Sequence, residues 1–325
     1  MQRMTLHEFE EQAQRFDSTV LCTADIDHFC SSTLWTLPAH NTLMQPQQAW
    51  ILAGEHGYVT LARGQHTQGW HYLQPLEAAW CLSSPLLGDV PHKLVEDFAS
   101  FCRAYAYAWD VMILAGLKID SILYRALFSK LAARYPTRQG PVARRYVASL
   151  KGGTEGFLSR RSANFRRGLA KDIGRIAQDG IVFEYAHCWD VLQADAAYER
   201  ILAVEARSWK GKKGVGINMG SMCEFYRLIN RRLVERGAQR MIIARHEDRD
   251  IGYVFGGIFG DTYRGLQFSF DDDYSRYGLG NVLQYEQIIE LCKAGIQNYD
   301  LGTDVAYKRR WGEICFDTVM LVVHR

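Results

Sequence analysis

A glycine-rich loop opens one of the helices that the sequence predicts. The segment Gly278-Leu279-Gly280-Asn281 follows an alternating apolar stretch and precedes a helical pattern that ends at Gly295. Several backbone N–H groups at a helix N-terminus lack intrahelical partners and carry partial positive charge, so they can hold a phosphate. Glycine lets the backbone approach such an anion closely. A tight strand-to-helix connection also favours glycine, so the loop alone leaves both interpretations open.

Glu205 is the first candidate for a group that accepts a proton. It lies four residues before Trp209 in one helical pattern, which predicts that a carboxylate and an indole line one wall of a cleft. A partly desolvated carboxylate has a raised pKa and can take a proton from an ammonium group near neutral pH. The alternatives are an exposed helix glutamate or one that is paired with Arg207 or Lys210.

Other polar and aromatic residues compete for roles at the same cleft. Asp271 and Asp273 end the predicted strand before the glycine loop, and turn formation is their alternative role. The basic loop 210–214 could clamp an acidic acceptor or cofactor phosphates, or be solvated. Lys308 and the tryptophans Trp209 and Trp311 are candidates for an acceptor pocket, although buried tryptophans usually belong to a core.

A strand–loop–helix–strand unit positions the glycine loop. Alternating apolar residues predict a strand over 266–270, a turn-rich piece covers 271–277, and a second strand follows over 296–301. A crossover of this kind makes two strands neighbours in a parallel arrangement. Strand and helix patterns also alternate in the N-terminal half, and a change of domain is expected near 137–141. The predicted domains are residues 1–150 and 151–325.

A basic helix is predicted over 157–178, at the start of the second domain. Apolar residues recur on one side at helical spacing, and arginines and lysines cover the other sides. One interpretation is a solvated helix that links the two domains. The other is a basic surface at the mouth of a cleft, which attracts a phosphorylated cofactor or an acidic carrier.

Composition restricts the class of protein. With 48% hydrophobic and 23% charged residues in 325, the chain reads as a soluble globular protein with room for two cores. Eight cysteines occur without a C-x-x-C pair, so neither a zinc site nor a disulfide framework is indicated. No metal cofactor is expected. The polar, acidic N-terminal stretch is unlike a signal peptide, and no apolar run has the length of a membrane span, so a cytoplasmic location is expected.

After residue 180 the predicted order is a strand, two helices, a three-strand meander, the glycine loop with its helix, a strand, a short helix and a final strand. This order resembles the GNAT N-acyltransferase fold. That superfamily carries a motif written Gln/Arg-x-x-Gly-x-Gly/Ala between the strand and helix of the crossover. The matching window here is 275–280, in which both glycines agree. Ser275 departs from the first position, and Arg276 comes one residue late. The departure puts the pyrophosphate contact in question rather than the fold.

A closer resemblance is to bacterial two-domain GNAT proteins of the CelD-like type, which are related to Fem-type aminoacyl transferases. Four segments carry this likeness: the basic helix 157–178, the stretch 205–211, the glycine-loop helix, and the ending 299–302 with 306–311. The resemblance implies an α/β (α+β) chain of two tandem GNAT-like modules, each a mixed, mainly antiparallel sheet flanked by helices. The second module would carry the cofactor loop, and the role of the first is open.

The resemblance also implies roles for single residues. Backbone groups of the strand would contact the pantetheine arm and the acyl group, and the loop would hold the pyrophosphate, so the cofactor-binding residues would be Gln267, Phe268, Ser269, Phe270, Arg276, Tyr277, Gly278, Leu279, Gly280 and Asn281. Tyr307 would protonate the departing thiolate, and Glu205 would be the base. The residues expected to contact the acceptor are Trp209, Lys210, Asp271, Asp304, Lys308 and Trp311.

The expected activity is transfer of an acyl group from acetyl-CoA or a longer acyl-CoA to an amine of a small molecule or amino sugar. One alternative is a Fem-type transferase that uses aminoacyl-tRNA, for which helix 157–178 would contact the RNA. A long helical hairpin, common in tRNA-using Fem proteins, is not apparent in the sequence. A third interpretation is a non-catalytic GNAT-like scaffold in polysaccharide or natural-product biosynthesis, which the departure at Ser275 keeps open.

Overall fold

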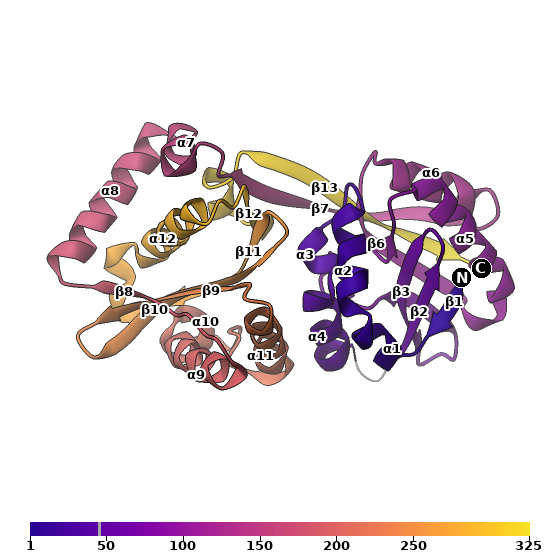
Figure 1. Ribbon diagram of the computed structural model, residues 1–325, viewed down its shortest axis with the longest axis horizontal. Coiled ribbons are helices and arrows are strands. Elements are labelled where there is room, and N and C mark those ends of the chain that lie inside the picture. Colours follow the sequence, from indigo (N-terminus) through magenta and orange to yellow (C-terminus); the bar gives the residue numbers. More distant parts are fainter. Residues whose placement is uncertain (45–46) are drawn as a thin grey trace. The chain divides into compact units, whose positions relative to one another are not determined.

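The chain folds into two compact units. The structure, a computed structural model, describes residues 1–44 and 47–325. The first unit consists of Met1–Arg144 together with Phe316–Arg325, and the second of Arg145–Cys315 (Figure 1). The domain division expected at residue 150 therefore lies close to the end of the first segment. The sequence-based division assigned residues 316–325 to the second domain, whereas in the structure Phe316–Arg325 belong to the first unit.

The first unit is built on a sheet in the order β1-β2-β3-β4-β6-β13. Neighbouring strands are antiparallel except β4 and β6, which are parallel. Its strands are β1 (Gln2–Met4), β2 (Gln48–Gly54), β3 (Gly57–Gln65), β4 (His71–Pro75), β6 (Val111–Lys118) and β13 (Ile314–His324), with a short β5 (Leu86–Leu87) beside β3. Strands β2 and β3 form a hairpin, with pairing from Gln48↔Arg63 to Gly54↔Gly57.

Helices enclose this sheet and bury its apolar residues. They are α1 (Leu6–Glu11), α2 (Ala13–Cys22), α3 (His28–Ser31), α4 (Thr33–Leu43), α5 (Pro91–Ala104), the short η1 (Ala106–Ala108) and α6 (Ile122–Ala132). Phe98 of α5, Leu127 of α6 and Leu114 of β6 belong to one fully buried cluster around Trp109. The chain passes from β4 through α5 to the parallel strand β6, which is a crossover connection.

The second unit repeats this plan with the order β7-β12-β11-β10-β9-β8. Its strands are β7 (Thr137–Ser149), of which 145–149 belong to this unit, β8 (Val182–Tyr185), β9 (Gln239–His246), β10 (Arg249–Phe259), β11 (Thr262–Phe270) and β12 (Asn298–Thr303). Only β11 and β12 are parallel, and α12 (Leu279–Lys293) connects them. The predicted strand–loop–helix–strand crossover is thus confirmed.

Helices cover both faces of the second sheet. In Figure 1, α12 lies on the opposite side of the sheet from α9 (Val191–Arg207), α10 (Trp209–Lys212) and α11 (Gly220–Glu235). Two further helices, α7 (Gly153–Ser159) and α8 (Ala163–Gln178), precede β8. The short turns η2 (Asp272–Tyr277) and η3 (Ala306–Arg310) follow β11 and β12. Among the described residues, no helix is long and apolar enough to cross a bilayer.

The single basic helix predicted over 157–178 is in fact two helices. The first ends at Ser159, and the side chain of Ser162 accepts a hydrogen bond from Phe165 N and so begins the second. Both helices belong to the second unit. The prediction of one linking helix was wrong because the apolar spacing continues across the break, whereas the capping serine that interrupts it gives only a local signal.

A buried ion cluster lies where β7, β11 and β12 meet. Asp300 Oδ2 is 2.7 Å from Arg145 Nη2 and 2.7 Å from Arg264 Nη1, and its Oδ1 accepts the N–H of Gly302 at 2.7 Å. Arg145 is fully buried, and Arg264 and Asp300 are nearly so. Two guanidinium groups in a low-dielectric site need this carboxylate to offset the cost of their desolvation.

Replacing Asp300 by asparagine is expected to destabilise the second unit by about 3–5 kcal/mol, because two buried arginines lose their anion. Urea unfolding combined with hydrogen exchange of the β11 and β12 amides measures this loss. The matched control is Asp248→Asn in the exposed turn between β9 and β10, which is expected to change the unfolding free energy by less than about 0.5 kcal/mol. Equal stability of the two variants would contradict the assignment.

Candidate active site

A groove opens where β11 and β12 separate. The two strands pair only from Thr262↔Asn298 to Arg264↔Asp300. Beyond that point each strand contains a register shift: Leu266 is extra relative to β10, and Leu301 is extra relative to β7. A β-bulge bends its strand and leaves a residue unpaired. Both extra residues line a cavity of about 250 Å³ between the diverging strands, which we call the β11–β12 groove.

The groove continues to the start of α12. A second hollow of about 230 Å³ shares Phe268, Phe270, Gln284 and Tyr307 with it and reaches Gly278, Gly280 and Asn281. A third, of about 400 Å³, lies between α8 and the same helix end, where Asp172 and Arg310 line it. The three hollows adjoin one another along the second unit. The glycine loop thus lies beside an elongated depression, as an extended ligand requires.

A buried polar network borders the groove on the side of α10. Lys210 Nζ lies 3.3 Å from Glu205 Oε1, and it donates to Gln267 Oε1 at 3.2 Å and to the carbonyl oxygen of Phe268 at 2.9 Å. Glu205 is fully buried; it accepts the N–H of Ile217 at 3.2 Å and the hydroxyl of Tyr253 at 3.0 Å.

Two pKa shifts in this network have burial as their main cause. Burial lowers the pKa of Lys210, and the nearby Glu205 carboxylate opposes that effect. Burial also raises the pKa of Tyr253 well above its ordinary value, and the same carboxylate adds to the rise. The network therefore presents one ammonium group to the groove, backed by a carboxylate and a neutral hydroxyl.

The expectation that Glu205 and Trp209 line one wall of the groove was wrong. Helix α9 ends at Arg207, and Ser208 is extended (φ −77°, ψ 165°), so a new helix begins at Trp209. The two side chains are consequently not one turn apart on a single helix. Trp209 is half exposed and lines the groove, whereas Glu205 lies behind Lys210 and pairs with it, which was one of the alternatives.

Tyr307 and Lys308, which both belong to η3, also line the groove. The Lys308 ammonium donates to the carbonyl oxygen of Thr303 at 3.0 Å. Burial, assisted by the positive charge of Arg264, lowers the pKa of Lys308 to about 8. Burial raises the pKa of Tyr307 to about 12, and its ring packs edge-on against Phe268. Near neutral pH the lysine can therefore exchange a proton, and the tyrosine stays protonated.

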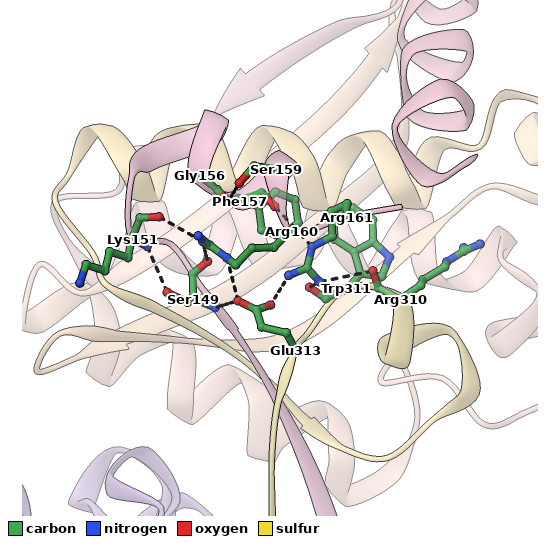
Figure 2. A network of polar contacts seen from close by, with 10 residues as sticks. All are labelled: Ser149, Lys151, Gly156, Phe157, Ser159, Arg160, Arg161, Arg310, Trp311 and Glu313. Atoms are coloured by element: carbon green, nitrogen blue, oxygen red, sulfur yellow. Dashed lines mark hydrogen bonds and ion pairs between the residues drawn. The ribbon is translucent and has the colours of Figure 1, made fainter. Parts of the chain in front are cut away.

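A charged network holds the segment that follows η3 (Figure 2). Arg161 donates to the carbonyl oxygens of Arg310 and Trp311 and pairs with Glu313, and Arg160 Nε donates to Glu313 Oε1 at 3.0 Å. Glu313 also accepts the N–H of Ser149 at 3.1 Å. Two arginines of the predicted basic helix therefore form ion pairs and hydrogen bonds inside the second unit. These contacts hold the end of η3, the turn that carries Lys308.

The residues expected to bind the cofactor fall into two groups. Seven line the groove or the hollow beside it: Gln267, Phe268, Ser269, Phe270, Gly278, Gly280 and Asn281. The other three do not line these hollows. Tyr277 and Leu279 have buried side chains in the apolar cluster beneath α12, and the guanidinium of Arg276 donates to Tyr277 Oη at 2.8 Å.

Three residues expected to bind the acceptor lie away from the groove. Asp271 is buried, and its Oδ2 lies 2.7 Å from Arg207 Nε and 2.6 Å from Arg249 Nη2. Trp311 is fully buried between the rings of Phe157 and Phe165. Asp304 pairs with Arg309. The structure gives these three side chains roles in packing and pairing; of the six expected, Trp209, Lys210 and Lys308 line the groove.

Asp172 is the residue at this site that sequence reasoning missed. Its carboxylate lies so close to Gly278 that a β-carbon on that glycine would be 2.1 Å from Oδ2. The amide nitrogen of the Asn281 side chain lies 3.4 Å from the same oxygen. The spacing of Asp172 from the apolar residues of α8 predicts on which face of that helix it lies. No nearby residue in the sequence indicates that this face contacts the glycine loop.

Comparisons with known proteins agree with this fold. Residues 163–309 match the family model of the acetyltransferase (GNAT) domain. The solved structure of FemX superposes with a TM-score of 0.69 at 11% identity, over 98% of this chain and 97% of that one. The structure of L-PGS from Bacillus licheniformis gives a TM-score of 0.59 at 11% identity, with 96% and 91% covered.

A third structure supports the same assignment. The C-terminal domain of a putative lysylphosphatidylglycerol synthetase from Agrobacterium fabrum has a TM-score of 0.57 at 15% identity, with 97% and 92% covered. No curated protein sequence matches significantly. The second unit is therefore a GNAT acetyltransferase domain. The chain as a whole has the two-domain fold of these solved structures, as the resemblance implied.

We predict that Glu205 and Lys210 are strongly coupled. Glu205→Gln leaves a buried ammonium without its anion, and Lys210→Met leaves a buried carboxylate without its cation, so each is expected to destabilise the unit by about 3–5 kcal/mol. The double variant is expected to lose clearly less than the sum, with a coupling energy of about 1–3 kcal/mol. Urea unfolding of the four proteins measures this cycle, and additive losses would show that the pair is not coupled.

Proposed function

We propose that the second unit transfers an acyl group from a coenzyme A thioester to the amine of a small molecule or amino sugar. The observation that carries the proposal is the groove between β11 and β12, which adjoins the start of α12 through shared lining residues. An acyl carbonyl and its pantetheine arm are extended and thin, and diverging strands offer unpaired backbone groups along one edge. The GNAT family match over 163–309 supports the same donor class.

Side chains in the groove suit such a donor. Ser269 is 3% exposed, and its hydroxyl has no hydrogen-bond partner within the described protein. Buried hydroxyl groups are rarely left unpaired, so an amide or carbonyl of a bound arm would supply the missing partner. The rings of Phe268 and Phe270 provide the apolar wall along the hollow that reaches α12.

Lys308 and Tyr307 are the groups that we propose to move protons. Attack by a neutral amine on the thioester carbon forms the C–N bond and leaves an extra proton on nitrogen, which neutral Lys308 would accept. As the C–S bond breaks, the Tyr307 hydroxyl would give its proton to sulfur. Transfer from Lys308 to the tyrosine restores both groups, so the net result is one proton moved from nitrogen to sulfur.

This assignment changes the expected roles of two residues. Glu205, predicted as the base, has no open path to the groove because Lys210 lies before it. We propose it as a positioning residue that holds the Lys210 ammonium beside β11. Lys308, predicted only to contact the acceptor, becomes the proton acceptor because burial brings its pKa to about 8.

The alternative of an aminoacyl-tRNA donor receives less support from the site. FemX shares the fold at 11% identity, which says nothing of the donor. An RNA contact by the predicted basic helix would use its arginines. Two of them, Arg160 and Arg161, pair with Glu313 instead. A non-catalytic scaffold is opposed by the cavity beside Lys308, since a degenerate site has no need of one.

The direct test is binding and transfer with the full chain. Isothermal titration with CoA and acetyl-CoA is expected to give saturable binding. Incubation of labelled acyl-CoAs with a panel of small amines and amino sugars is expected to release CoA thiol in equal amount to acylated product. Failure of every CoA species to bind would overturn the proposal, and tRNA that binds with a steep salt dependence would revive the alternative.

A second prediction concerns pH. Because neutral Lys308 accepts the proton, kcat/KM is expected to rise with pH through about 8 and to level off above it. Lys308→Met is expected to lower kcat by about 10²–10⁴-fold and to remove this inflection. The matched control is Lys293→Met, an exposed lysine paired with Glu290 on α12, which should leave the profile unchanged. An unaltered inflection in Lys308→Met would assign it to another group.

A further inference from the structure

We propose that Asp172 determines how strongly the second unit binds its donor, because its carboxylate occupies the place at the start of α12 where the donor's diphosphate would lie. The inference rests on the proposed function. It predicts that the resting protein blocks its own phosphate position. Donor binding then requires the carboxylate to leave.

The position of Asp172 is defined by the glycine that begins the helix. Gly278 has a left-handed backbone (φ +65°), and a β-carbon there would lie 2.1 Å from Asp172 Oδ2 and 2.9 Å from Oδ1. Both carboxylate oxygens therefore lie against this backbone. The Asn281 side chain donates toward Oδ2 over 3.4 Å. A carboxylate so placed gains from the same partial positive charge that would attract a phosphate.

Contacts on either side hold α8 against this loop. The guanidinium of Arg175 donates to the carbonyl oxygen of Arg276, and the Tyr277 hydroxyl donates to Asp179 beyond the end of α8. Leu169 and Ile176 of α8 pack into the same apolar cluster as Leu279. Polar and apolar contacts thus hold α8 against the loop. They position Asp172, which lies on α8, beside Gly278.

A diphosphate and the Asp172 carboxylate cannot share this place. Like charges within about 4 Å repel strongly at a partly buried site, and Asp172 has a side chain that is only 17% exposed. The carboxylate already pairs with Arg175, whose Nη1 lies 3.7 Å from Oδ1 on the same helix, and a rotation toward this guanidinium would take it away from the loop. Arg310, whose guanidinium donates to Asn281 Oδ1 at 3.1 Å, would then remain beside the loop as a cation for the phosphate.

One of the two interpretations drawn from the sequence had the opposite sign. In that interpretation the basic helix attracts a phosphorylated cofactor through its positive charge. The side chain that it brings to the glycine loop is instead an acid, while Arg160 and Arg161 of the preceding segment pair with Glu313. A donor that carries no phosphate at this point does not meet the carboxylate. Asp172 should therefore distinguish CoA from pantetheine.

The test compares the full chain with Asp172→Asn, and uses CoA and pantetheine as probes in isothermal titration. Removing one negative charge beside the diphosphate is expected to tighten CoA binding by about tenfold or more, and to leave pantetheine binding within about twofold. Asp172→Ser is a second variant that removes the charge with a shorter side chain. Asp248→Asn, an identical chemical change in an exposed turn, is the control and should bind both probes as the parent does.

The outcomes separate the two proposals. If the parent binds CoA and neither Asp172 variant binds it more tightly, the role of Asp172 is wrong while the proposed function stands. Equal tightening of CoA and pantetheine would also contradict it, because the effect would not pass through the diphosphate. If neither the parent nor the variants bind CoA or release its thiol, both proposals fail.

Discussion

The contact between Asp300 and two arginines sets the geometry of the second unit. It joins β7, β11 and β12 at the last residue pair where β11 and β12 run side by side. Gly302 follows in a left-handed conformation (φ +79°), and a β-carbon there would lie 3.0 Å from the Arg264 guanidinium. The strands are thus clamped at one point and bend away from each other immediately after it. The groove exists because the clamp and the bulges at Leu266 and Leu301 coincide.

Strand β11 divides the groove into two sides through its alternation. Gln267 points toward Lys210 and Tyr226, whereas Phe268 and Phe270 face the start of α12. Successive residues of one strand therefore contact the Lys210 network and the hollow beside α12, where we propose that the donor lies. The alternation explains how one short strand can contact the Lys210 network with one residue and line the apolar hollow beside α12 with the next.

Periodicity and turn residues were sufficient to predict the crossover and its glycine loop, because both are local. Seven of the cofactor-binding residues that the resemblance implied line the groove or the hollow beside it, and their contacts with a donor stay predictions. Two of the failures depended on neighbours far apart in the sequence: Trp311 is enclosed by rings from α7 and α8, and Asp172 meets Gly278 across more than a hundred residues. A third failure was local, because Ser208 ends a helix between Glu205 and Trp209. The lowered pKa of Lys308 depends on burial, which no spacing reveals.

The return of Phe316–Arg325 to the first unit has a consequence for synthesis on the ribosome. Strand β6 pairs with β13 from Lys118↔Thr318 to Val111↔His324, so the first unit lacks an edge of its sheet until these residues emerge. An exposed sheet edge is a site for wrong pairing. The whole of the second unit is translated during that interval. The amino-terminal unit, although synthesised first, would therefore be completed after the second unit. Until then, the unpaired edge of β6 in the nascent chain must avoid pairing with other chains.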